Sequence, residues 1–333
     1  MTTRLTAGLL LAICFCSVAA RAESTPATAL LVLSKSDRTL AIVDPTSLHV
    51  IARMPSGPDP HEVIASADGK FAYISNYGGG AYNTLTPVDL VAQKALPVVD
   101  LGPLRGPHGL DFMGGKVWFT AEAAKAIGSY DPATQKVDWI LGTGQNRTHM
   151  ILVANDLKRI VTSNVSSGTM SIIEKTTGGR NPGGDWEETV VAVGPGAEGF
   201  DISPDGREIW AANAGDGTVS VVDTATRKVS ATLPANVKSA NRLKFTPDGK
   251  LVFVSCLGGP DLVVLDAATH QEVKRIKIGH GAAGIQMQPD GSRAFVSCTP
   301  DNYVTIIDLK TLEITGHLDA GKEPDGLAWV VRR

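Results

Sequence analysis

One motif recurs along almost the whole chain and sets the number of structural units. Four segments align on a Pro-Asp-Gly or Ala-Asp-Gly turn, and each is followed by a short β-rich run: His61–Gly69, Glu198–Gly206, Asn241–Gly249 and Ala283–Gly291. Apolar strands that end in an acidic residue then recur every 42 to 49 residues: Asp44, Asp89, Asp131, Glu174, Asp223, Asp266 and Asp308. A pattern repeated seven times at this period predicts seven copies of one supersecondary unit.

Each copy is predicted to hold four antiparallel strands. Asp-Gly pairs suit tight hairpin turns because glycine accepts a positive φ, and no stretch has a sustained helical period. Four strands in this period are typical of a propeller blade, whereas a β-sandwich would not explain the sevenfold recurrence. The chain begins at a second strand and ends with a lone first strand. We therefore expect an all-β, seven-bladed β-propeller over residues 23–333, closed by a composite blade that joins the C-terminal strand to the N-terminal strands.

The charge balance narrows the class of partner. The net charge is −3, from 31 basic and 34 acidic residues, and no run of basic residues is present. A protein that neutralises many phosphates needs a basic surface, so we expect no nucleic acid partner. We expect a monomer that binds a small molecule or a protein.

The first 22 residues resemble an export signal. Arg4 precedes an uncharged apolar run from Ala7 to Ala20, and Ala20-Arg21-Ala22 fits a signal-peptidase site. We expect a signal peptide over residues 1–22, cleavage before Glu23, a periplasmic or secreted protein, and no membrane span in the mature chain; an uncleaved anchor is the alternative. Cys256 and Cys298 end near-copies of one strand, and we expect free thiols there, because equivalent positions in neighbouring repeats are usually too far apart for a disulfide.

The repeats resemble the YVTN-type β-propeller family, whose repeat is about forty residues long. The residues that carry the resemblance are the Ser-Pro-Asp-Gly turns, the strands Tyr73–Asn76 and Trp210–Asn213, and third strands such as the one ending at Asp223. The resemblance covers residues 28–333 and implies a propeller. It also implies a secreted or periplasmic binding protein, with enzymes among related propellers.

One repeat position carries most of the candidate chemistry. The first strand of each blade lines the central channel, so its starting residues should meet at one end, here called the top. These starting residues are called the column. Around the ring they are His61, His108, His149, Glu198, Asn241, Ala283 and Asp325. Three histidines beside a glutamate suit a divalent metal such as Zn, Cu or Fe, or acid–base chemistry. The alternative is that a wet channel mouth simply tolerates histidine.

Other residues are expected near the same end. Arg105 and Arg147 could hold a carboxylate or phosphate, or could be solvated loop residues. Tyr77 begins a glycine-rich turn and could form one wall of a ligand site. We interpret Asp59, Glu122 and Glu323 as surface charge, with a supporting role behind the histidines as the alternative.

Several recurrent residues are interpreted as structural. The turn acids Asp205, Asp248 and Asp290 recur because Asp-Gly makes the turn. Trp118, Trp210 and Trp329 are expected between blades. The insertion Thr176–Glu188 is interpreted as a surface loop at the bottom end.

One blade also resembles the streptogramin-lyase propellers, through Gly106–Leu110, Val117–Thr120 and Ile127–Gly128. That resemblance implies elimination chemistry that uses a histidine, a glutamate and Mg, and it carries over to His108, with His61 and His149 in the same column. Three hypotheses follow: an exported binding propeller with a ligand or metal at the top, a metal-dependent lyase or lactonase that uses these histidines catalytically, and a structural scaffold. Whether the protein is an enzyme stays open.

Overall fold

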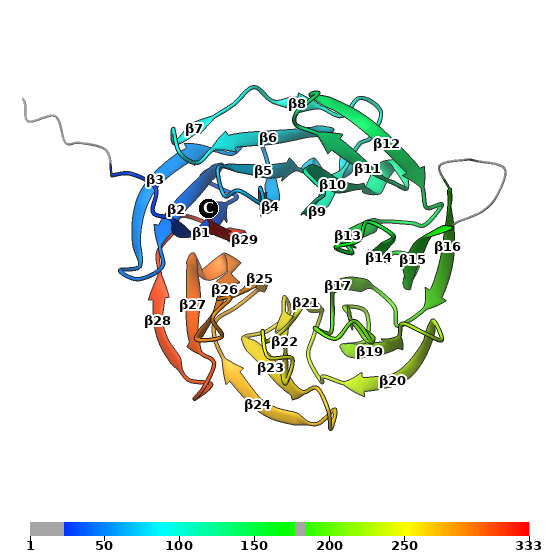
Figure 1. The fold of residues 1–333 in the computed structure, drawn as a ribbon. Helices are drawn as coiled ribbons and strands as arrows, with labels where there is room; N and C mark the ends of the chain where they lie inside the picture. The colour runs from blue at the N-terminus through cyan, green and yellow to red at the C-terminus, as the bar shows by residue number, and fades with distance from the viewer. Residues whose placement is uncertain (1–22, 177–183, 333) are drawn as a thin grey trace, which may run out of the picture.

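Seven sheets surround a central axis in the computed structural model, which describes residues 23–176 and 184–332 (Figure 1). The predicted signal peptide lies outside these residues. The sheets are called blades 1 to 7. Blade 1 contains β29 (Pro324–Val331), β1 (Thr28–Ser34), β2 (Thr39–Asp44) and β3 (His49–Pro55). Blade 2 contains β4 (Pro60–Ala65), β5 (Phe71–Asn76), β6 (Thr84–Asp89), β7 (Lys94–Ala95) and β8 (Val99–Asp100).

The remaining blades each hold four consecutive strands. Blade 3 contains β9 (Pro107–Met113), β10 (Lys116–Ala121), β11 (Ala126–Asp131) and β12 (Lys136–Gly142). Blade 4 contains β13 (Thr148–Val153), β14 (Arg159–Asn164), β15 (Thr169–Thr176) and β16 (Asp185–Ala192). Blade 5 contains β17 (Ala197–Ile202), β18 (Glu208–Asn213), β19 (Thr218–Asp223) and β20 (Lys228–Pro234). Blade 6 contains β21 (Ala240–Phe245), β22 (Leu251–Cys256), β23 (Asp261–Asp266) and β24 (Glu272–Lys277). Blade 7 contains β25 (Ala282–Met287), β26 (Arg293–Cys298), β27 (Tyr303–Asp308) and β28 (Ile314–Leu318).

Helix is almost absent from the described residues. The 3-10 helices are η1 (Gly78–Gly80), η2 (Glu122–Ala124) and η3 (Thr299–Asp301), and each follows the second strand of its blade. Within residues 23–176 and 184–332, no helix is long and apolar enough to cross a membrane.

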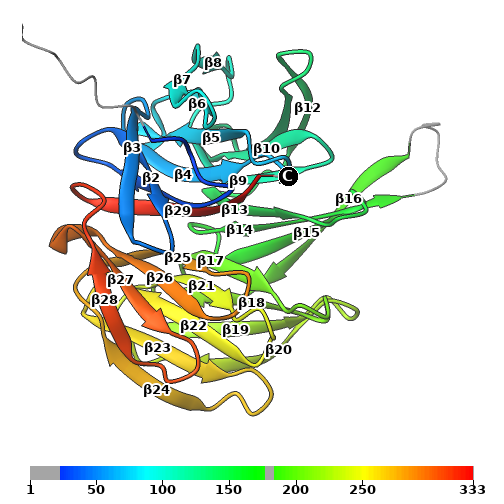
Figure 2. The same ribbon diagram turned by 60° about the vertical axis from the view of Figure 1, so that its left-hand side comes forward.

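The ring closes through the composite blade that the sequence predicts. β29 pairs antiparallel with β1, placing Trp329 opposite Leu30 and Ala328 opposite Leu31. The two ends of the chain therefore share one sheet in the order β29, β1, β2, β3, and Figure 2 shows the red β29 together with the blue strands of this blade. Each of the seven sheets keeps only short edges, the inner one along the channel and the outer one at the rim of the ring.

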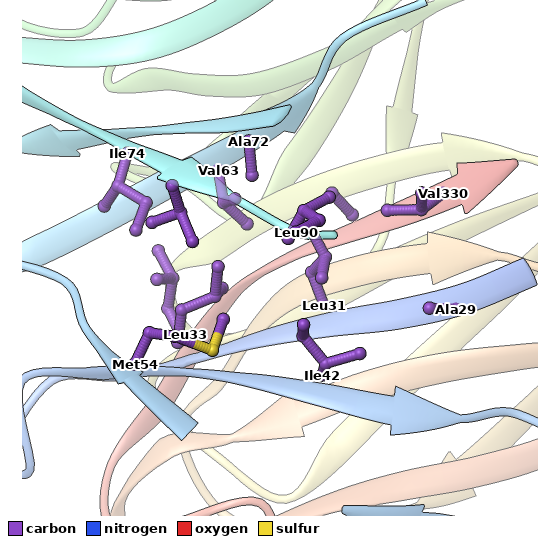
Figure 3. Close-up of a cluster of buried hydrophobic side chains, with 13 residues drawn as sticks. Ala29, Leu31, Leu33, Ile42, Met54, Val63, Ala72, Ile74, Leu90 and Val330 are labelled. Atoms are coloured by element: carbon purple, nitrogen blue, oxygen red, sulfur yellow. The ribbon is translucent and has the colours of Figure 1, made fainter. Parts of the chain in front are cut away.

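The hydrophobic core lies between neighbouring blades. Leu31 and Ile42 of blade 1 belong to the same buried cluster as Val63 and Ile74 of blade 2 (Figure 3). The predicted inter-blade tryptophans have this role as well: Trp118 clusters with Ile151 of blade 4, Trp210 with Leu243 of blade 6, and Trp329 contacts Phe295 of blade 7. Burying these faces against one another is what holds the seven sheets together.

The structure also shows the turn acids, the two cysteines and the insertion for which the sequence makes predictions. Asp205 accepts hydrogen bonds from Ser203 and from the backbone N–H of Arg207, which supports its role in the turn. Cys256 and Cys298 are both buried free thiols. The insertion in blade 4 is only partly a loop, because β15 runs to Thr176 and β16 begins at Asp185; residues 177–183 lie outside the described residues.

Candidate functional site

A pocket of about 400 Å³ opens at the top of the channel and gathers most of the predicted site. Every column residue lines it, and so do Tyr77 and Arg147: His61, His108, His149, Glu198, Asn241, Ala283 and Asp325. Arg105 is exposed and lies outside the pocket. Sequence reasoning missed several lining residues: Lys35, Arg242, Leu257, Gly281, Thr299 and Pro300.

Buried hydroxyls on the second strands hold column residues at the same height along the channel axis. In blade 3, Thr120 donates to the backbone carbonyl of His149 in the next blade (2.8 Å) and accepts from the N–H of Gly109 in its own blade (2.9 Å). The equivalent hydroxyl recurs in other blades and bonds to the carbonyl of the next column residue: Ser75 to His108, Ser163 to Glu198, Ser255 to Ala283 and Ser297 to Asp325. In these five blades the second strand is thus tied to the first strand of the next blade where the site begins.

Replacing Thr120 by valine should test this link. Thr120→Val keeps the shape of the side chain but leaves a buried N–H and a buried C=O without their partner, so we expect a loss of about 1–3 kcal/mol in the free energy of unfolding. Urea unfolding measures this loss. The matched change at the exposed Thr134 should cost less than about 0.5 kcal/mol; equal losses at both positions would contradict a structural role for the Thr120 hydroxyl.

Glycine follows the column residue where the first strands come closest. A Cβ added at Gly109 would lie 2.5 Å from the carbonyl oxygen of His149, and one at Gly284 would lie 2.4 Å from that of Asp325. Gly199 and Gly326 have the same relation to Asn241 and His61. A glycine after the column residue is therefore a sequence signal of close strand packing.

Three imidazole rings and one phenol ring form the centre of the pocket. The ring centroids of His61 and His108 are 5.0 Å apart, and those of His108 and His149 are 3.8 Å apart. Tyr77 lies edge-on to His61 at 4.8 Å and to His108 at 5.1 Å. The three predicted histidines therefore do converge.

His149 is held as a cation. Its Nε2 lies 2.7 Å from Glu198, its Nδ1 hydrogen-bonds Glu122, and its side chain is only 4% exposed. Because each ring nitrogen faces a carboxylate, each carries a proton. Burial alone would lower the pKa of His149, but Glu198 and Glu122 raise it above its ordinary value. Burial also opposes ionisation of Glu198, yet the charge of His149 lowers the pKa of Glu198 to about 2.

His108 is the opposite case. It is 2% exposed, and its Nδ1 is buried with no hydrogen-bond partner among the described residues. Burial lowers the pKa of His108 well below its ordinary value, and the neighbouring charges of His149 and His61 lower it further. The ring is therefore neutral, with one nitrogen that can donate and one that can accept a hydrogen bond.

An ion pair crosses the channel beneath the histidines. Arg242 of β21 bonds to Glu62 of β4, and its guanidinium also lies 3.9 Å from Glu198. These two strands belong to blades on opposite sides of the ring (Figure 1). Arg147 contacts Glu122 at 3.4 Å. Three cationic side chains (Arg147, His149, Arg242) thus face three carboxylates (Glu62, Glu122, Glu198), so the network is balanced in charge.

His61 occupies the other side of the pocket. Its Nε2 lies 3.3 Å from Asp59 and its Nδ1 lies 3.6 Å from Asp325, which Lys35 also contacts at 3.3 Å. The hydrogen bond from His61 lowers the pKa of Asp59 to about 2. Asp59 and Glu122 were interpreted from sequence as surface charge; they lie directly behind two of the histidines, and Glu122 is 5% exposed.

The geometry does not bring the predicted metal ligands into a coordination site. No group of three or more His, Cys, Asp or Glu side chains is arranged to hold a metal in the part of the chain that the structure describes. His149 has both nitrogens occupied by carboxylates, which leaves it no lone pair for a metal. Metal binding by His61, His108, His149 and Glu198 therefore stays a prediction for elemental analysis.

The pH dependence of the free energy of unfolding at acidic pH should reveal the Glu198–His149 pair. A carboxyl with an unfolded pKa of 4.5 and a folded pKa of about 2 stabilises the fold fully above the higher value, and this contribution is lost as the pH falls toward the lower one. We expect Glu198→Gln to flatten the fall in free energy of unfolding between about pH 4.5 and 2. Urea titrations at several pH values measure it. The exposed control Glu313→Gln should keep the wild-type profile, and identical profiles for both variants would contradict the pairing.

Fold and site together define a seven-bladed propeller with a ligand-sized pocket at its channel mouth. The model of the YNCE-like beta-propeller family matches residues 110–290, more than half of the chain, and the chain belongs to that family. No curated protein matches at a significant level.

Solved structures show the same architecture at low sequence identity. A functionally unknown protein from Desulfotomaculum acetoxidans is 12% identical with a TM-score of 0.75, covering 92% of this chain and 99% of its own. A proposed 6-phosphogluconolactonase from Bacteroides uniformis is 14% identical with a TM-score of 0.74, covering 91% and 99%. Hydrazine synthase from Kuenenia stuttgartiensis is 18% identical with a TM-score of 0.66, covering 81% and 89%. Likeness at this level concerns the fold alone.

Proposed function

We propose that this protein is an exported propeller that binds a small polar molecule in the top pocket. The observation that carries the proposal is His108: a buried, neutral imidazole without a hydrogen-bond partner for its ring among the described residues, whose ring centroid lies 3.8 Å from that of the cationic ring of His149. Nδ1 is fully buried, so Nε2, which is not among the fully buried atoms, is the nitrogen that can contact a ligand. Polar groups in a protein interior normally have a partner, so an unpartnered imidazole at a pocket is a candidate ligand contact. A volume of about 400 Å³ suits a small-molecule ligand better than a protein partner.

Arg147 supports the proposal from the rim. Its side chain is 43% exposed, it contacts Glu122 at 3.4 Å, and it lies beside Tyr77. The guanidinium therefore keeps several N–H groups for a ligand oxygen. We infer that His108 contacts the buried part of the ligand and that Arg147 contacts an outer oxygen.

A panel of defined compounds tests the proposal. We would measure thermal shifts of the mature protein with hexoses, amino acids, short carboxylic acids and δ-gluconolactone. At least one compound should raise the Tm of the wild type, and His108→Asn should weaken its binding at least tenfold, while the exposed control His49→Asn should not. The proposal fails if no compound shifts the Tm, or if the shift is equal in the His108 variant and the wild type.

A second candidate function is enzymatic, as a lyase or lactonase that uses the same histidines. The neutral ring of His108 beside the cationic ring of His149 favours it, because two groups with oppositely shifted pKa values are suited to act as base and acid. Hydrolysis of δ-gluconolactone by the wild type and by His108→Asn tests it: a rate lost in the variant supports the enzyme, and a rate equal to the uncatalysed one contradicts it.

The finer repeat assignment and the location are also proposals. The resemblance of the turns and strands supports a YVTN-type repeat, and the apolar run after Arg4 supports export to the periplasm or outside the cell. N-terminal sequencing of the protein from a periplasmic fraction should begin at Glu23; a chain that still begins at Met1 in the membrane fraction would contradict cleavage.

A further inference from the structure

A second, larger pocket lies at the bottom end, between blades 2 and 3. Its volume is about 860 Å³, against about 400 Å³ for the top pocket. Its walls include Ser66 and Asp68 of the β4–β5 hairpin and Pro132 and Gln135 of the β11–β12 turn. These turns are at the opposite end of the strands from the column of histidines, so the two pockets share no lining residue.

A break in the outer strand of blade 2 helps to form this pocket. The fourth strand is divided into β7 and β8, both paired with β6, whereas the fourth strands of the other blades are continuous over five to eight residues in the described part of the chain. Pro97 stands in the break, where a residue without an N–H cannot extend the ladder. Leu96, Pro97 and Val98 then form one wall.

The opposite wall is aromatic. Phe71, Tyr73, Phe112 and Tyr130 all line the pocket. Tyr73 and Phe112 stack with their centroids 6.0 Å apart and their planes at 15°. A wall of this kind offers flat apolar surface to a flat ligand.

Two phenol groups have no partner. Tyr73 is 4% exposed and Tyr130 is 6% exposed, and no hydrogen bond to either hydroxyl occurs among the described residues. Neither hydroxyl oxygen belongs to the fully buried unpartnered atoms, so each keeps access to the pocket. Burial raises the pKa of Tyr73 to about 12 and also raises that of Tyr130, so both hydroxyls remain donors at neutral pH.

The acidic residues in the lining disfavour a negatively charged ligand. Asp68 and Asp100 line the pocket, and no lysine or arginine does; Lys70 pairs with Asp68 at 3.5 Å, so Asp100 is the carboxylate whose charge acts on a ligand. An anion would therefore be repelled, while an uncharged ligand pays no such cost.

We propose that this pocket is a second binding site, for an uncharged aromatic molecule whose carbonyl oxygen accepts hydrogen bonds from Tyr73 and Tyr130. The aromatic wall supplies the stacking surface, and the two hydroxyls give orientation and specificity. The proposal does not depend on the function of the top pocket.

Coumarin is the probe for this site, because it is flat, uncharged and has a carbonyl acceptor. Calorimetric titration of the mature protein should show saturable binding at one site. Tyr73→Phe and Tyr130→Phe keep each ring and remove one hydroxyl, so each should weaken binding about fivefold, and the double variant about 25-fold. Tyr82→Phe, a change at a tyrosine that is 41% exposed and outside the pocket, should leave the affinity unchanged.

Two further measurements separate the possible outcomes. Coumarin-3-carboxylate should bind more weakly than coumarin, because Asp100 repels its charge. His108→Asn should leave coumarin binding unchanged, which distinguishes this site from the top pocket. Absence of saturable coumarin binding, or equal affinity in the wild type and the Tyr73→Phe/Tyr130→Phe variant, would overturn the proposal.

Discussion

His149→Leu is expected to lower the free energy of unfolding by about 3–5 kcal/mol near neutral pH. The reason is that Glu122 and Glu198 are both mostly buried, with side chains 3% and 14% exposed, and His149 is the cation between them. Removing one member of a buried charge network leaves the others uncompensated, which costs far more than the lost packing. Urea unfolding monitored by circular dichroism measures the loss.

A matched change at His61 provides the control for this prediction. His61 is more exposed, at 17%, and Lys35 still contacts its partner Asp325, so His61→Leu should cost clearly less. Glu198→Gln combined with His149→Leu should recover part of the stability, because one buried charge is then removed. Equal losses at His61 and His149 would contradict a cationic His149.

Arg242→Met is expected to have a similarly large effect and to open the floor of the top pocket. Glu62 and Arg242 pair across the channel with side chains 14% and 11% exposed, so the variant leaves Glu62 without its partner at about 3–5 kcal/mol. Methionine retains most of the apolar stem of arginine, so the loss comes mainly from charge. Urea unfolding at neutral pH checks it.

The double variant Glu62→Leu/Arg242→Met separates pairing from position. Replacing both members of a buried pair by apolar residues is often neutral in stability, so the double variant should regain most of the loss. A double variant less stable than Arg242→Met alone would show that Glu62 has a stabilising partner other than Arg242.

The fold could be predicted because the same local signals occur in every blade. The Asp-Gly turn is set by backbone conformation, as the hydrogen bonds of Asp205 to Ser203 and Arg207 show, and it marks the first hairpin of blades 2, 5, 6 and 7. The lone strand at the C-terminus and the missing first strand at the N-terminus leave one way to close the ring. The break at Pro97 has no counterpart in the other repeats. A prediction from recurring residues therefore could not find the break or the pocket beside it.

The site could be predicted only as a list of channel positions. Because the column is set by the repeat, His61, His108 and His149 were placed together correctly. The protonation of His149 depends on Glu122, which lies in η2 of the neighbouring blade, and on Arg242 of the pair across the channel. Neither contact can be predicted from a spacing in the sequence. Both join residues of different blades, which come together only when the ring closes.

The central claim is that His108 is a neutral imidazole that contacts the ligand of the top pocket. Long-range nitrogen-15 NMR of the histidine rings tests it most directly, before and during titration with the most stabilising compound of the panel. His108 should remain neutral well below the pH at which a free imidazole takes up a proton, and its ring resonances should shift as the compound binds. A His108 that takes up a proton near pH 6.5, or whose resonances stay fixed while the compound saturates the protein, would contradict the account.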